Sequence, residues 1–180
     1  MAKLAMGLAA AVLSLAAVQD EMIDNPEYQG WKSQKVGAWV KYKMTNDMGT
    51  MKMEGEVTSK LKELTAEKAV IDQLTIIEMM GKKHETPMTR PIPAKVKKGT
   101  DSEGAKVEIL EEGDEELTIK EKKYKCHWVK MKTTNKGQVM NMKVWRNDQI
   151  VGGAARFEMT SEGDMKMTIT MNVLDWKAGE

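Results

Sequence analysis

Hydrophobic and polar residues alternate along most of the chain with the period of a β-strand. Between residues 51 and 61 the odd positions are mostly apolar or small, whereas the even positions are charged or polar. The same alternation returns between residues 165 and 173. Because successive side chains of a strand point to opposite faces, each segment predicts a strand with one buried and one solvated face. Residues 69–80 are apolar on both faces, which predicts a central or doubly covered strand.

Turn-forming residues separate these segments at a spacing that predicts a meander of about seven or eight strands. The turn signals lie at residues 46–47, 66–67, 81–82, 112–114, 135–137, 152–153 and 162–163. Residues 84–98 contain three of the four prolines of the chain. Proline cannot donate a backbone hydrogen bond to a neighbouring strand, so we expect an edge strand or a crossing loop there.

One short helix is expected before the first strand of the meander. Asn25 has the side chain of a helix N-cap, and Pro26 fits the first helical position. Tyr28 and Trp31 then share one face of a helix that ends near Gln34. Together the patterns predict an all-β fold, an antiparallel meander that forms a half-barrel or open barrel, in a single domain over residues 20–180.

Residues 1–19 have the features of a secretory signal peptide: a positive start, an apolar segment, and small residues before a cleavage site. A buried N-terminal helix is the alternative interpretation. The apolar segment is too short for a comfortable spanning helix, so we expect no stable membrane span in the mature form. No cysteine follows the segment to carry a lipid anchor. The predicted location is therefore periplasmic or extracellular.

Composition and charge narrow the class of protein further. The chain has 180 residues, of which 41% are hydrophobic and 31% charged, as expected for a globular domain with a core. Its 28 basic and 27 acidic residues leave a net charge of +1, which argues against a nucleic-acid partner. The single cysteine, Cys126, excludes an intramolecular disulfide. Cys126 and His127 are neighbours on a predicted strand and point to opposite faces, so they do not form a nucleophilic pair.

The sequence lacks the motifs that carry common enzyme chemistry. It has no Gly-x-Ser-x-Gly elbow, no phosphate-binding loop, no His-Glu-x-x-His and no dinucleotide fingerprint. We therefore expect no enzymatic activity, no catalytic residues, no resident metal and no cofactor. The acidic residues between 111 and 116 match no EF-type calcium loop, and we interpret them as a solvated hairpin tip.

Methionine is the unusual residue, with 17 copies. Three Met-x-Met pairs, Met51/Met53, Met140/Met142 and Met165/Met167, each place two thioethers on one strand face. Methionine side chains adapt to varied apolar partners, so such a face suits an apolar or lipid-like ligand. Thioethers also bind Cu(I), with His84 or His127 as further ligands.

These features predict a secreted, non-enzymatic binding module with a methionine-rich concave face. The expected ligand-binding residues are Trp31, Met53, Val57, Met140, Met142, Met167, Ile169 and Met171. One alternative is a structural or protein-interaction domain, with an unknown protein partner, in which the methionine face is simply the core. A second alternative is an extracytoplasmic copper-binding protein.

The chain contains an internal sequence repeat, which we call the internal echo. Residues 39–53 aligned with residues 128–142 are identical at eight of fifteen positions, among them the starting tryptophan and the closing Met-x-Met pair. The pattern of each copy predicts a strand, a turn and a second strand. The echo indicates either an ancient duplication or a hairpin pattern used twice.

Several segments together resemble a family of uncharacterised secreted proteins from planctomycete-like bacteria. They are Asn25-Pro26-Glu27-Tyr28 with Trp31, residues 37–43, Lys125-Cys126-His127-Trp128, and the run from Trp145 through Gly152-Gly153 to Arg156. That family tends to have Ser, Pro and Lys where this chain has Asn147, Val151 and Arg156. More remotely, the strand pattern resembles LolA-like lipoprotein-localisation factors. This resemblance implies a curved antiparallel sheet that holds acyl chains on its concave face under a helix.

Overall fold

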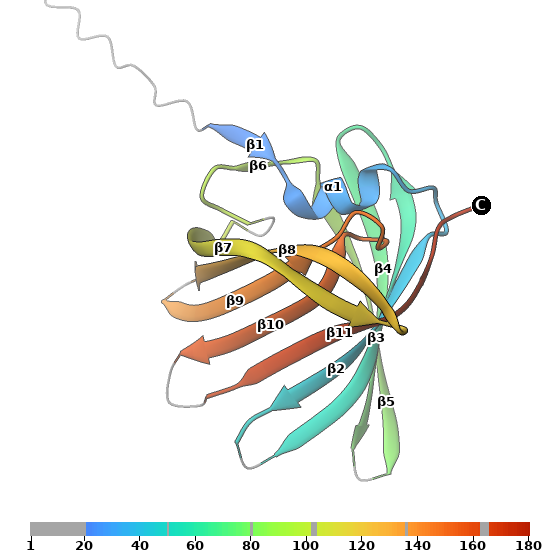
Figure 1. Cartoon of the computed structure of the whole chain (residues 1–180), viewed down its shortest axis with the longest axis vertical. Coiled ribbons are helices and arrows are strands. Elements are labelled where there is room, and N and C mark those ends of the chain that lie inside the picture. The colour runs from blue at the N-terminus through green and yellow to red at the C-terminus, as the bar shows by residue number, and fades with distance from the viewer. Residues whose placement is uncertain (1–20, 50, 80, 102–103, 136, 163–165) are drawn as a thin grey trace, which may run out of the picture.

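Nine antiparallel strands form one curved sheet that stays open as a half-barrel (Figure 1). The computed structural model describes residues 21–180 apart from 50, 80, 102–103, 136 and 163–165. The elements are β1 (Met22–Asp24), α1 (Pro26–Lys32), β2 (Trp39–Asp47), β3 (Lys52–Leu64), β4 (Lys68–Met79), β5 (Lys82–Pro93), β6 (Lys95–Lys97), β7 (Lys106–Ile119), β8 (Lys122–Asn135), β9 (Gln138–Arg146), β10 (Ala154–Glu162) and β11 (Thr168–Lys177). The predicted all-β, open half-barrel class is confirmed.

Some sequence predictions fall outside the described residues. These are the signal peptide at residues 1–19, Met80, Met165, and parts of the turns at residues 136 and 163. Signal cleavage therefore stays a prediction. Among the described residues, no helix is long and apolar enough to cross a bilayer.

The strand order reveals two consecutive meanders in one sheet. The order is β5-β4-β3-β2-β11-β10-β9-β8-β7, so β2–β5 form a four-stranded meander and β7–β11 a five-stranded one, joined through β2 and β11. The two copies of the internal echo fall on β2–β3, the first hairpin of the first meander, and on β8–β9, the second hairpin of the second meander. The duplication stays a prediction.

The chain crosses from one edge of the sheet to the other between β5 and β7. In this crossing, β6 pairs with β1 as a separate two-stranded sheet, with Ile23 opposite Val96. The proline-rich stretch forms the edge strand β5 and leads into this crossing. The sequence prediction of an edge strand or crossing loop is therefore correct in both parts.

Helix α1 is short and is held by its ends and by one buried face. The Asn25 side chain accepts a hydrogen bond from the Glu27 backbone N–H, and Pro26 occupies the first turn. Tyr28 and Trp31 are buried, and the Tyr28 hydroxyl donates to the Thr65 carbonyl at 2.7 Å. A seven-residue helix is not stable alone in water, so these contacts keep it folded.

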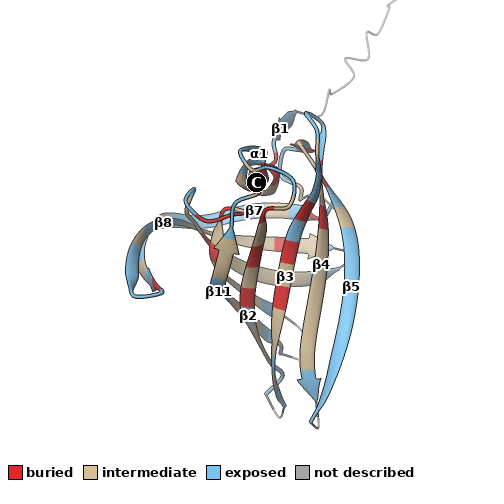
Figure 2. Cartoon of the chain, turned by 90° about the vertical axis from the view of Figure 1, so that its right-hand side faces the viewer, coloured by how far each residue is buried: buried red, intermediate tan, exposed pale blue. Residues whose placement is uncertain are grey.

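The core lies at the α1 end of the half-barrel. The helix packs against β3, β4 and β5, and Figure 2 shows the buried parts of β2, β3 and β4 toward the helix, with exposed residues at their far ends. Leu61 and Ile71 are fully buried direct partners on β3 and β4. The half-barrel is therefore closed by a core at one end and open at the other.

The acidic segment was predicted wrongly. Residues 111–116 lie within β7, and the β7–β8 turn falls at Lys120 and Glu121, which both have positive φ. Neither residue carries the usual glycine or asparagine signal of such a turn. Gly113, which suggested the turn, serves packing instead, because a methyl group there would lie 2.8 Å from Trp128 Cζ2.

Replacing Gly113 with alanine should destabilise the fold by about 1–3 kcal/mol, since Trp128 must shift to admit the new methyl group. Urea unfolding followed by tryptophan fluorescence measures the change. Glu112→Ala, at an exposed neighbouring position, is the control and should stay within about 0.5 kcal/mol. Equal stability of the Gly113→Ala variant and the wild type would contradict this packing role.

Candidate functional site

The two faces of the nine-stranded sheet differ in character. We call the face that carries Tyr42 and Val57, and against which α1 packs, the inner face. Directly paired residues on neighbouring strands share a face, so the register assigns each residue to one side. On the outer face, charges pair across strands, as in Lys41–Glu56 at 3.2 Å and Lys43–Glu54 at 2.9 Å. Such exposed pairs add little to stability and mainly keep this part of the face solvated.

Beyond the core, the inner face is lined by methionines. Seven of them are half-buried, and we call this set the methionine band: Met44, Met53, Met131, Met140, Met142, Met159 and Met171. The register also places half-buried Phe157 and Ile169 on this face. The result is an apolar, adaptable surface that is open to solvent rather than filled by a second layer.

The register brings most of the predicted ligand-binding residues onto this one face. Met53, Val57, Met140, Met142, Ile169 and Met171 all belong to the inner face. Met167 immediately precedes β11 and is half-buried. Two of the predicted residues lie deeper than a surface role requires, since Trp31 is 4% exposed and Val57 is 5% exposed. They support the face from the core, whereas the others line its open part.

Sequence reasoning missed three members of the band, which are Met44, Met131 and Met159. Met131 and Met159 are both direct partners of the predicted Met142, so three thioethers lie side by side on β8, β9 and β10. Met44 is the direct partner of Met171. Met131, Met159 and Met44 stand outside the Met-x-Met pairs, and only the strand register places them in the band.

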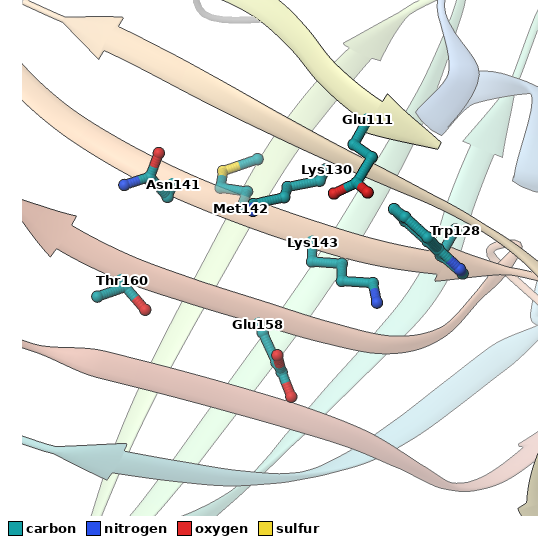
Figure 3. A pocket seen from close by; sticks show the side chains of 8 residues that line it. All are labelled: Glu111, Trp128, Lys130, Asn141, Met142, Lys143, Glu158 and Thr160. Atoms are coloured by element: carbon teal, nitrogen blue, oxygen red, sulfur yellow. The ribbon is translucent and has the colours of Figure 1, made fainter. Parts of the chain in front are cut away.

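A shallow polar hollow of about 240 Å³ lies on the outer face (Figure 3). It is lined by Glu111, Trp128, Lys130, Asn141, Met142, Lys143, Glu158 and Thr160. The Lys143 amine lies 3.9 Å from the Trp128 ring centre and 4.4 Å from that of Trp145. Trp145 donates from Nε1 to Glu115 at 2.7 Å. The outer hollow is thus built from charges stacked on aromatic rings, unlike the inner face.

A second hollow, of about 270 Å³, lies where the end of β7 meets β10 and β11. Its lining residues are Glu116, Leu117, Thr118, Ile119, Ala155, Arg156, Asn172 and Val173. Neither hollow is enclosed by the methionine band, although Met142 borders the first.

A cluster of charged and polar groups lies beneath α1 at the inner face. Both carboxylate oxygens of Glu27 accept hydrogen bonds from Arg90. Arg146 donates from Nη1 to the Pro26 carbonyl at 3.1 Å, and burial lowers its pKa. The Tyr42 hydroxyl donates to the Ala154 carbonyl at 3.1 Å. Burial, and then the nearby Glu27 carboxylate, raise the pKa of Tyr42 well above its ordinary value.

Tyr42 should make the fold sensitive to alkaline pH. Because its pKa is raised in the folded state, its contribution is complete below the ordinary tyrosine pKa of about 10 and falls as pH rises above it. At pH 7, Tyr42→Phe should cost about 1 kcal/mol through the lost hydrogen bond. The difference between the two proteins should shrink or reverse by pH 11. Thermal melts at both pH values measure it, and a constant difference would argue against a buried neutral hydroxyl.

The cysteine and the two histidines do not converge. Cys126 is fully buried, and burial raises the pKa of its thiol, which favours the unreactive protonated form. His127 is exposed and lies 3.3 Å from Asp114. His84 is on β5, at the opposite edge of the sheet from β7 and β8. In the described part of the chain, no three His, Cys, Asp or Glu side chains are grouped as metal ligands.

No protein-family model matches the chain, and no curated protein matches it at a significant level. Two solved structures are similar to it in part. One is a DUF1329 family protein from Desulfovibrio piger, with 7% identity and a TM-score of 0.31, over 84% of this chain and 88% of that chain. The other is described as an outer membrane lipoprotein-sorting protein domain from Vibrio parahaemolyticus, with 8% identity and a TM-score of 0.29, over 84% and 89%.

The second of these structures is of the lipoprotein-sorting type that the strand pattern resembles. Likenesses with such low scores carry no weight for the fold or the function of this chain. The resemblance to planctomycete-like secreted proteins stays a prediction. The functional conclusion therefore depends on the chain's own faces and side chains.

Proposed function

We propose that the protein is a periplasmic or extracellular, non-enzymatic binding module that holds an apolar or lipid-like molecule against the methionine band. The observation that supports this most strongly is that the seven methionines of the band lie on one face of an open sheet and are only partly buried. A contiguous apolar surface on a soluble protein usually marks a binding site. Methionine suits a flexible ligand, because its unbranched side chain repacks around varied shapes.

The position of the band relative to α1 supports the same proposal. The core and α1 close one end of the half-barrel, and the band begins where the core ends. A ligand would extend the core outward and cover surface that water now contacts. The gain is about 25 cal/mol for each Å² of apolar surface buried, so a long acyl chain is favoured over a small polar molecule.

Native mass spectrometry of the mature protein, purified from a periplasm without detergent, tests this proposal. We expect an added mass typical of a lipid that is released on denaturation. Titration with a fluorescent fatty acid is the companion measurement and should show saturable binding. A bare mass together with no saturable binding would contradict the proposal and favour a structural or protein-interaction domain.

Copper binding is a second candidate function, favoured by one specific observation. Met131, Met142 and Met159 are neighbours across three strands, and three thioethers make a soft ligand set suited to Cu(I). A ligand that binds only the folded protein raises its melting temperature. An unchanged melting temperature with excess Cu(I) under reducing conditions would argue against this candidate.

A further inference from the structure

The inner face of β9 changes from apolar to cationic along its length. Met140, Met142, Val144 and Arg146 alternate onto this face, with Arg146 at the end nearest α1. The first three continue the apolar surface, and Arg146 then lies beneath the helix. A guanidinium at the end of an apolar path is the arrangement that an amphiphile with a negative head group requires.

Arg146 has spare hydrogen-bonding capacity. Among the described residues, its side chain donates to the Pro26 carbonyl at 3.1 Å. A guanidinium has five N–H donors in a planar fork that matches a carboxylate. Arg146 is half-buried, so much of its hydration has already been lost on folding. An anion bound there would meet a donor that water competes for only in part.

The neighbouring charges leave one positive charge for such an anion. Arg90 neutralises Glu27, so Arg90, Glu27 and Arg146 together carry one net positive charge. On β8, the direct partner of Arg146 is His127. His127 lies 3.3 Å from Asp114 and 3.8 Å from Glu112, so these carboxylates already have a partner on their own hairpin.

We propose that Arg146 binds the carboxylate of a single-chain amphiphile of the fatty-acid class, whose acyl chain lies along β9 over the methionine band. This inference rests on the proposed function and adds the head group to it. Six residue steps separate Met140 from Arg146, which is about 20 Å along a strand. That span accommodates an extended acyl chain of ordinary length with its head group at the helix end.

Calorimetric titration with dodecanoate and with dodecanol separates the head group from the tail. Both probes offer the same chain, but only the acid offers a carboxylate. The wild-type protein should bind the acid about tenfold to a hundredfold more tightly than the alcohol, as expected for a charge-assisted hydrogen bond. Arg146→Gln should remove most of this preference while leaving the affinity for the alcohol unchanged.

The matched control is Arg156→Gln. Arg156 is also a half-buried arginine, but it contacts Glu158 and the Trp145 ring on the outer face. This variant should keep the wild-type preference for the acid. Arg146→Lys keeps the charge without the fork and should retain part of the preference. Circular dichroism shows whether each variant folds. If Arg146→Gln does not fold, the acid preference of Arg146→Lys, compared with that of the wild type and of Arg156→Gln, tests the role of Arg146.

The outcomes separate the two proposals. Equal affinity for acid and alcohol in the wild type would overturn the role of Arg146 while leaving the apolar site intact. A preference that survives in a folded Arg146→Gln variant would overturn it as well. No binding of either probe would instead contradict the proposed function itself.

Discussion

Replacing Trp31 with alanine should lower the free energy of unfolding by about 3–5 kcal/mol, the usual cost of removing a buried tryptophan. Trp31 is 4% exposed and packs where the loop after β9 meets β2. A methyl group added at Gly152 would lie 3.0 Å from Trp31 Cζ2 and 3.5 Å from a Val40 methyl. The side chain therefore fills a closely packed space that alanine would leave empty.

The loss should extend to α1 as a whole. The helix has seven residues and depends on two buried side chains, Tyr28 and Trp31, to stay on the sheet. Urea unfolding monitored by circular dichroism measures the change. Lys32→Ala, at the exposed end of the same helix, should cost no more than about 0.5 kcal/mol. A loss below about 1 kcal/mol for Trp31→Ala would show that α1 is not anchored by this residue.

Replacing Met171 with aspartate should weaken the binding of a fluorescent fatty acid at least tenfold. Met171 is half-buried between its direct partners Met44 on β2 and Phe157 on β10. A bound acyl chain would have to remove water from the new carboxylate without offering it a hydrogen bond, and this desolvation is costly. Displacement of the probe by unlabelled dodecanoate confirms that both compete for the same site.

The neighbouring position on β11 supplies the control. Asn172 is exposed and faces the outer side, where Arg156 is its direct partner. Asn172→Asp introduces the same carboxylate one residue away on the opposite face and should leave binding unchanged. If both variants fold and bind like the wild type, the inner face is not the binding surface. If both variants lose binding equally, the added negative charge weakens binding from either face, and the loss does not locate the ligand on the inner face.

The alternation of polar and apolar residues predicted the faces correctly because it is a local property. On β3, the odd positions from Met53 to Leu61 do lie on the inner face. The N-cap and the buried pair of α1 are equally local, and both are confirmed. Local patterns cannot distinguish the functions of a single glycine. Gly113 suggested a turn, but the structure uses it to let Trp128 lie against β7.

The contacts that define the site are not local, and the sequence did not predict them. Met131 and Met159 belong to different hairpins, and only the register of β8, β9 and β10 brings them beside Met142. Only the fold places Arg146 against the start of α1, where it donates to the Pro26 carbonyl. Its position in the sequence, just after Trp145, gave no signal that it lies under a helix more than a hundred residues earlier.

The internal echo links the two halves of the sheet to the band. Met53 and Met142 are equivalent positions of the repeated segment. Both lie in one row of direct partners that runs across β3, β2, β11, β10 and β9, through Asn46, Ile169 and Met159. Each meander thus contributes an equivalent methionine to the same row.

The most direct test of the central claim is a titration of methyl-labelled methionine with dodecanoate, followed by nuclear magnetic resonance. We expect the methyl signals of the methionine band to shift in a saturable way. The signal of Met22, which is 53% exposed on β1 outside the large sheet, should not move. Unmoved band signals at saturating dodecanoate, or equal shifts of Met22 and the band, would contradict a ligand held against the inner face.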